Sequence, residues 1–327
     1  MSAPHGAPAP VETDRQEEQA EQARPSAVRR LGLQRFAILI VFAAMVAAFG
    51  ADIPSTFLSI GNLSNILGGQ AVLFILVMAV ILPTIMGDFV DLSLGSSLGL
   101  SAMTLAVLNV QHHTPVVIAC LAGIGAALVV GLVNVFFVVY FDNDPFIVTL
   151  GVMTIVQGII YIISGNNSVG IVSGKLSDWI FNNSFLQIPL EFYYGLAIFL
   201  VVWYVLSFTP VGQKALVIGQ SREVARLTGV RVNRMRSWAF ILGAAIAGVA
   251  GIAYAAVFLG ATAIKPGRIN ALGALIAVYF LAAGTAGLEL LGTANYIQQI
   301  FYGAALVAAV TIPKATRDRV LKRKRSA

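Results

Sequence analysis

Long apolar stretches recur along almost the whole chain, and they restrict its possible folds more than any other feature. They run over about Leu33–Phe49, Ile66–Ile85, Leu92–Leu108, Val116–Tyr140, Phe146–Ile163, Tyr193–Phe208, Trp238–Leu259, Ala271–Leu291 and Ile300–Ile312. A helix needs roughly 20 apolar residues to cross a bilayer, and lipid offers no partner for a free backbone group. Because no strand-like alternation is visible, we predict an all-α, polytopic transmembrane helix bundle with about nine spans.

The composition also indicates a membrane protein. Of the 327 residues, 58% are hydrophobic and 11% are charged, whereas a soluble domain carries roughly 25% charged residues. Cys120 is the only cysteine, so the chain forms no internal disulfide and no cysteine-built metal site. Glycines within the fifth and seventh spans, Gly151, Gly243, Gly248 and Gly251 among them, predict close packing between helices.

Positive charge is confined to three short blocks, which predict the orientation of the chain. The blocks are Arg29, Arg30 and Arg35, then Lys214, Arg222, Arg226, Arg231, Arg234 and Arg236, and finally Lys314, Arg317, Arg319, Lys322, Arg323, Lys324 and Arg325. Lys and Arg are enriched in cytoplasmic loops. We therefore predict a multi-pass protein of a bacterial plasma (inner) membrane with a cytoplasmic N-terminus, whose net charge of +6 faces lipid headgroups and not nucleic acid.

Three regions follow from these patterns. Residues 1–28 are rich in Ala, Pro, Glu and Gln and are predicted to form a disordered cytoplasmic tail. Residues 29–313 form the transmembrane domain, and residues 314–327 form a basic cytoplasmic tail. A signal peptide is the alternative for the first apolar span, but the preceding segment is too long and too acidic for one.

The motifs for catalysis and metal binding do not occur in the sequence. The segment Gly170–Leu176 has the wrong glycine spacing for a P-loop and lacks its Ser or Thr. His5, His112 and His113 do not form a helical pair with a Glu, so a zinc site is not supported. We predict no catalytic residue, no metal and no cofactor, so that any ATP must be bound by a partner subunit.

Asp88 and Asp91 lie between the second and third spans, and two interpretations of Asp91 remain open. It could cap the helix that begins near Leu92, where the backbone donors and the helix dipole favour a carboxylate. It could instead act in transport, because ionisable groups at membrane depth are costly and often functional. Asp88 is interpreted as solvated.

The basic loop after the sixth span contains the signals of a short surface helix. Ser221 is a plausible N-cap, Glu223 lies in the first turn, and Gly229 is a plausible stop. Val224 and Leu227 form a small apolar ridge. The helix could lie on anionic lipids, or its ridge could dock in a groove of a soluble partner.

Four stretches of the chain resemble motifs of one protein family, in the same order. They are Asp91–Gly95, Pro145–Gly151, Ile218–Gly229, and Gly273–Gly292 followed by Tyr296–Gln299. These stretches are similar to those of permease subunits of bacterial ABC importers of the ribose, xylose and arabinose type, within a superfamily that includes branched-chain amino-acid permeases. The chain departs from the family at Val224 and Glu289, and by one additional residue before Asp91.

The resemblance implies partners, a mechanism and site residues. The partners are an ABC ATPase subunit, an extracytoplasmic solute-binding protein and a second permease copy or paralogue. The expected function is import of a monosaccharide or similar small polar solute by alternating access, driven by the ATPase. The ATPase-coupling residues would be Ser221, Glu223, Ala225, Arg226, Leu227 and Gly229. The candidate translocation or gating residues are Asp91, Ser93, Gly95, Thr149, Gly151 and Gln157.

Three rival functions are less well supported. An amino-acid or nucleoside ABC permease remains open, because composition does not separate neutral polar solutes. An ion-coupled secondary transporter would favour a buried charge in mid-span, and the first seven spans have none near their centres. A membrane-embedded enzyme would need a nucleophile–base or metal set.

The count of spans predicts that one crossing is absent. Nine spans from a cytoplasmic N-terminus would leave the basic C-terminus outside, which the Lys and Arg distribution opposes. The family resemblance places an additional helix between about Ile264 and Gly267. A re-entrant hairpin over Trp238–Ile264, bent at Gly248 or Gly251, is the alternative, but about 27 residues at 1.5 Å each allow only one crossing.

Overall fold

The computed structural model describes residues 37–88, 91–165, 184–257, 271–293, 297–298 and 300–305. Nearly all of them are helical, and the predicted all-α fold is confirmed. The chain divides into two compact units, Met1–Ala48 and Phe49–Ala327, and the second contains every described helix that begins after residue 48. The predicted tails 1–28 and 314–327 and the predicted missing crossing near Ile264–Gly267 lie outside the described residues.

The helices follow one another with short connections. α2 (Ala37–Asp52) runs from the first unit into the second and is followed by α3 (Pro54–Phe57), α4 (Ile60–Gly69), α5 (Ala71–Ile85), α6 (Ser93–Ala106), α7 (Val116–Asn134), α8 (Pro145–Ser164), α10 (Leu190–Phe208), α11 (Pro210–Gln220), α12 (Arg222–Leu227), α13 (Val232–Val257) and α14 (Ala271–Leu290). α6 and α7 end in π-helical turns, η1 (Val107–Gln111) and η2 (Val135–Tyr140). A two-residue antiparallel hairpin, β1 (Ser184–Phe185) and β2 (Ile188–Pro189), precedes α10.

Six helical segments of the described residues are long and apolar enough to cross a membrane. They are Ile60–Ile85, Ser93–Gln111, Val116–Tyr140, Pro145–Ser164, Leu190–Phe208 and Val232–Ala255. These segments correspond to the second to seventh predicted spans. Two shorter apolar helices, Leu39–Asp52 and Leu275–Leu290, coincide with the first and eighth, and the ninth falls partly outside the description.

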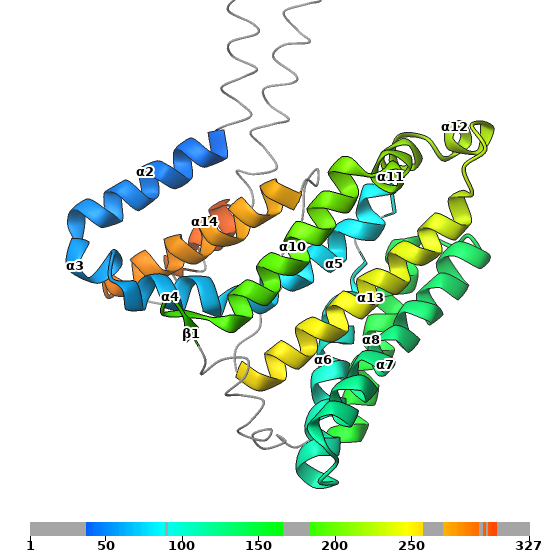
Figure 1. Cartoon of the computed structure of the whole chain (residues 1–327), viewed down its shortest axis with the longest axis horizontal. Coiled ribbons are helices and arrows are strands. Elements are labelled where there is room, and N and C mark those ends of the chain that lie inside the picture. The colour runs from blue at the N-terminus through cyan, green and yellow to red at the C-terminus, as the bar shows by residue number, and fades with distance from the viewer. Residues whose placement is uncertain are drawn as a thin grey trace, which may run out of the picture. The chain divides into compact units, whose positions relative to one another are not determined.

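α13 is the central helix of the second unit, packed against α5, α6 and α7 (Figure 1). Beta-carbons added at Gly243, Gly248 and Gly251 would lie 3.1 Å or less from atoms of neighbouring helices. The hydroxyl of Ser101 on α6 donates a hydrogen bond to the Gly248 carbonyl at 2.8 Å. The predicted close packing is therefore confirmed for α13, but not for Gly151, where nothing lies within 4 Å.

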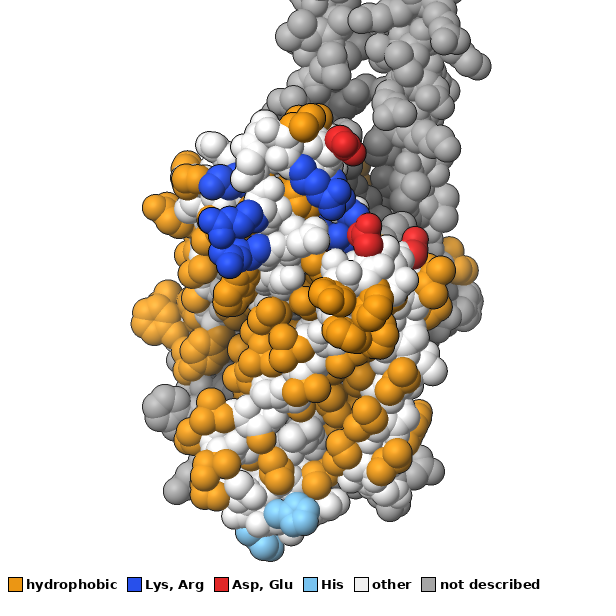
Figure 2. Space-filling view, turned by 90° about the vertical axis from the view of Figure 1, so that its right-hand side faces the viewer, with side chains coloured by type: hydrophobic (Ala, Val, Ile, Leu, Met, Phe, Trp, Pro, Cys, Tyr) orange, Lys and Arg blue, Asp and Glu red, His pale blue; other side chains and the backbone are white. Residues whose placement is uncertain are grey.

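Basic side chains gather at one end of the second unit. Every Lys and Arg of the described residues lies between Lys214 and Arg236, and Figure 2 shows them together with acidic side chains, while the histidines lie at the opposite end. This separation places the α5–α6 connection, α11, α12 and the start of α13 in one charged region. The candidate site lies there.

Candidate functional site

α12 begins and ends where the sequence predicts. The Ser221 side chain accepts a hydrogen bond from the Val224 backbone N–H at 3.3 Å, which is an N-cap contact. At the other end Gly229 has φ +79°, and its N–H donates to the Arg226 carbonyl at 3.0 Å. A left-handed residue after the last turn suits glycine, which has no β-carbon to clash.

The two faces of α12 differ sharply. Ala225 is buried in an apolar cluster with Met86, Ala215, Ile218, Val232 and Ala239. Leu227 is 82% exposed, and Val224, Glu223 and Arg226 are exposed as well. The buried face fixes α12 to the bundle, and the opposite face presents an apolar ridge between charges of opposite sign.

The segment before α12 lies directly on the end of α5. Gly87 has φ +76°, and a β-carbon there would lie 3.2 Å from the Gly219 carbonyl oxygen of α11. Gly219 in turn lies against the Ile85 carbonyl. Backbone therefore meets backbone at this point, and a larger residue at either glycine would push α11 away from α5.

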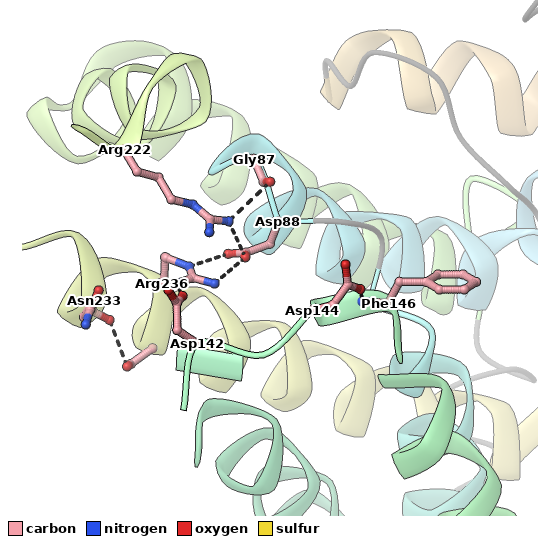
Figure 3. A network of polar contacts seen from close by, with 9 residues as sticks. Gly87, Asp88, Asp142, Asp144, Phe146, Arg222, Asn233 and Arg236 are labelled. Atoms are coloured by element: carbon pink, nitrogen blue, oxygen red, sulfur yellow. Dashed lines mark hydrogen bonds and ion pairs between the residues drawn. The ribbon is translucent and has the colours of Figure 1, made fainter. Parts of the chain in front are cut away.

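Asp88, the next residue, is held by two arginines (Figure 3). Arg236 of α13 donates from Nε to Asp88 Oδ2 at 2.9 Å and from Nη2 to Oδ1 at 2.6 Å. Arg222 of α12 donates from Nη2 to the same Oδ1 at 2.7 Å. The interpretation of Asp88 as solvated is wrong: α11 and α12 cover the end of α5, and a carboxylate buried there requires paired charges.

The loop between α7 and α8 also reaches this cluster. Arg236 Nη1 lies 3.4 Å from Asp142 Oδ1. Two residues later, Asp144 caps α8 by accepting from the Phe146 N–H at 2.8 Å (Figure 3). The sequence did not indicate Arg236 or Asp142 as functional candidates. The only local signal nearby is Asp144 before Pro145, which is typical of the start of a helix.

Asp91 forms a second set of contacts, in which its partners are uncharged. Its Oδ1 accepts from the Ser93 N–H at 2.9 Å and from the Ser93 hydroxyl at 2.7 Å, and its Oδ2 accepts from Asn134 Nδ2 at 3.3 Å. Asn134 also donates to the Ser93 hydroxyl at 2.7 Å. Asp91 thus contacts one backbone donor at the start of α6, although Leu92 is the N-cap residue of that helix, and its carboxyl is buried.

Burial raises the pKa of the Asp91 carboxyl to about 6, although the hydrogen bonds from Ser93 and Asn134 act in the opposite direction. The Leu92 N–H donates to the Thr149 hydroxyl at 3.3 Å. The structure therefore brings together Asp91, Ser93 and Thr149 from the predicted set, and adds Asn134.

The other predicted gating residues do not join this cluster. Gly95, Gly151 and Gln157 are exposed, and open space surrounds the two glycines. Within the described part of the chain, no three His, Cys, Asp or Glu side chains come close enough together to hold a metal ion.

Comparison with known proteins gives consistent relatives. The chain is 28% identical to the ribose import permease protein RbsC of Escherichia coli, over 84% of this chain and 92% of RbsC. It is 26% identical to the probable ABC transporter permease protein YphD of E. coli, with 90% and 93% covered. It is 25% identical to the D-allose transport system permease protein AlsC of E. coli, with 86% and 91% covered. No solved structure matches the chain.

The alignments with both YphD and RbsC contain positions of the relative that have no counterpart in this chain. The YphD alignment runs over 313 positions but covers 90% of the 327 residues, about 294, so about 19 positions of YphD have no counterpart here. The RbsC alignment runs over 298 positions but covers 84% of the chain, about 275 residues, which leaves about 23.

A family profile completes the comparison. The profile described as "Branched-chain amino acid transport system / permease component" matches residues 62–310, which include the whole charged region and the helices that support it. Proteins of this kind are transport subunits and not enzymes. The match covers most of the chain, and the protein belongs to this family of membrane permease components.

Proposed function

We propose that this protein is the membrane permease of an ATP-driven importer for a monosaccharide or similar small polar solute, and that α12 docks on a separate ATPase subunit. One observation carries the proposal: α12 is fixed from beneath through Ala225 while Leu227 is 82% exposed. An apolar ridge held rigidly by a bundle suits docking in a partner's groove. Relatives named as ribose and D-allose permeases support a sugar as the solute.

Alternating access follows from this arrangement. ATP would close a pair of ATPase subunits, and the docked helices of two permease copies would move with them. An extracytoplasmic solute-binding protein would deliver the solute. The charged end in Figure 2 would face the cytoplasm, because Lys and Arg are enriched in cytoplasmic loops. The N-terminus would lie on the same side, because Arg29, Arg30 and Arg35 follow the same rule.

A charge exchange on α12 tests the docking. The double variant Glu223→Arg/Arg226→Glu keeps the net charge of the helix but reverses its pattern. We expect it to abolish uptake and to reduce co-purification of the ATPase, with the amount of permease in the membrane unchanged. Normal uptake and normal ATPase recovery would contradict docking.

A second variant separates docking from lipid binding. Lys214 is exposed on the preceding helix, α11, and Lys214→Glu changes the local charge by two units. Attraction to anionic lipid depends on net charge, so a lipid-only role predicts a larger effect of Lys214→Glu than of the charge-neutral exchange. Docking predicts the reverse order.

The solute class is tested by uptake of labelled probes. Cells that express the permease with its ATPase and binding protein should accumulate D-ribose or D-allose, and L-leucine should not compete. Competition by L-leucine without sugar uptake would favour the amino-acid alternative, which the description of the family profile keeps open.

We further propose that the chain lacks one crossing of its relatives after α13. About 20 relative positions without a counterpart support this, as does the odd number of predicted spans. A single cysteine at Arg268→Cys, in a Cys120→Ser background, can be labelled from each side of the membrane. Labelling from outside is expected, because α13 then crosses once and no helix returns the chain to the cytoplasm before residue 268. Labelling from the cytoplasm, with α13 a regular crossing, would overturn the proposal.

A further inference from the structure

Asp88 joins three parts of the second unit through one carboxylate. It lies at the end of α5, it accepts from Arg236 of α13, and it accepts from Arg222 of α12. α13 is the helix that packs on α5, α6 and α7. Arg222 also donates to the Gly87 carbonyl at 3.4 Å. A displacement of α12 can therefore reach the centre of the bundle through the Arg222 side chain.

The two arginines hold Asp88 in different ways. Arg236 uses two nitrogens, at 2.9 and 2.6 Å, and its side chain is 1% exposed. Arg222 uses one nitrogen on the carboxylate, at 2.7 Å, and its side chain is 33% exposed. A bidentate, buried pair is the stronger contact, and an ion pair open to water is the weaker one.

This asymmetry decides which contact can open. If Arg222 withdraws, Arg236 still neutralises Asp88, and Arg222 itself regains water. If Arg236 withdrew, a buried carboxylate and a buried guanidinium would both lose their main partner, which is costly. The Arg222 contact can open and close without unfolding the junction, whereas the Arg236 contact cannot.

α12 is a short helix that connects α11 to α13. One residue, Ser221, separates it from α11, and α11 is held on α5 by the close approach of Gly219 to the backbone at Ile85. α12 also packs on the bundle through Ala225, which lies in the apolar cluster with Ile218 and Val232. Arg222, the first residue of the helix, is therefore its polar connection to α5 and α13.

We propose that Arg222 is a positioning residue, a releasable contact on Asp88 through which movement of α12 is transmitted to α5 and α13. The inference rests on the proposed docking of α12 to an ATPase. It assigns transmission to Arg222 and permanent neutralisation of Asp88 to Arg236.

The test uses the complete transporter reconstituted in liposomes, with D-ribose as the probe or D-allose where only that sugar is transported. The measured quantity is the number of solute molecules imported for each ATP hydrolysed. For Arg222→Gln we expect this ratio to fall about tenfold, a typical size for a coupling between two sites. ATPase recovery and the rate of ATP hydrolysis should stay near the wild-type values.

Two matched variants complete the experiment. Arg222→Lys keeps a positive charge near Asp88 and should recover most of the ratio, which a purely structural role of the guanidinium would not predict. Arg234→Gln removes an exposed arginine two residues before Arg236 and should leave the ratio unchanged.

The outcomes separate this inference from the proposed function. A wild-type ratio in Arg222→Gln would overturn the inference and leave docking intact. A ratio that falls only in step with ATPase recovery would also overturn it, because Arg222 would then be a docking residue. If the wild-type permease recovers no ATPase, the proposed function fails, and the inference fails with it.

Discussion

Two buried carboxyl groups, at the two ends of the second unit, differ in their hydrogen-bond partners. Asp88 receives three charged hydrogen bonds from two arginines. Glu191, at the start of α10, is 0% exposed, and neither of its carboxyl oxygens has a hydrogen-bond partner among the described residues. Its Oε1 lies where a β-carbon on Gly68 would be only 3.1 Å away.

The paired Asp88 indicates that the charged end has a fixed polar arrangement, whereas the unpaired Glu191 does not indicate one at the other end. A buried charge that is paired contributes to a defined geometry, and breaking the pair is costly. A buried carboxyl without a partner is a cost that the surrounding packing must offset. We therefore expect substitutions that break the buried Asp88–Arg236 pair to be harmful and substitutions at Glu191 to be tolerated.

The largest effect is expected for Arg236→Gln. The variant leaves Asp88 buried with only the partly exposed Arg222, and loss of one partner of a buried pair costs about 3–5 kcal/mol of folding free energy. The amount of protein in the membrane and the thermal midpoint in detergent should both fall. Arg234→Gln, which removes an exposed charge from the same helix, should change stability by less than about 0.5 kcal/mol.

A smaller effect is expected at Asp91. Asp91→Ala leaves the Ser93 and Asn134 donors without their acceptor and should cost about 1–3 kcal/mol. Asp91→Asn keeps an acceptor oxygen and should be nearly as stable as the wild type. Uptake by Asp91→Asn then decides between the two interpretations of this residue: retained uptake indicates a cap, whereas lost uptake at normal expression indicates a role for the charge.

At the opposite end, Glu191→Gln tests the other half of the comparison. Removing a buried, unpaired acid should leave the free energy of unfolding unchanged or increase it by about 1 kcal/mol. The thermal midpoint should accordingly stay the same or rise. Sugar uptake should persist. A loss of stability as large as that of Arg236→Gln would show that the carboxyl is paired in the assembled transporter, and the contrast between the two ends would disappear.

The smallest effect is a pH dependence that comes from Asp91. Because its folded-state pKa is raised from 3.8 to about 6, the folded protein binds this proton more tightly than the unfolded chain. The stabilisation is complete below about pH 3.8 and is lost as the pH rises through about 6. Between pH 7 and pH 5 the wild type should gain about 1 kcal/mol relative to Asp91→Asn. If the thermal midpoints of the two proteins change equally with pH over this range, the raised pKa of Asp91 is contradicted.

Local patterns were enough to predict six membrane-length helices and the ends of α12. Apolar runs report membrane helices directly, and a cap such as Ser221 or a stop such as Gly229 acts within about four residues of its own position. The burial of Ala225 beneath an exposed Leu227 also follows the expected two-faced helix.

Pairing across the fold was not predictable from such patterns. Arg236 meets a carboxylate 148 positions earlier, and Asn134 meets Ser93 at a separation of 41 positions. These contacts depend on how α13 and α7 pack, which no local signal reports. Asp88 was misinterpreted for the same reason, because its burial is produced by α11 and α12 and not by its own neighbours.

The central position of α13 has a consequence for how the protein is made. The helices that surround it, α5, α6 and α7, all precede it in the chain, so a ribosome delivers them to the membrane first. α13 then enters a space in which a β-carbon at Gly251 would clash with the Leu98 carbonyl oxygen, and β-carbons at Gly243 and Gly248 would also be closely confined. Such a close fit favours one rotational setting of α13, and α13 can adopt it only when the three earlier helices are already correctly arranged.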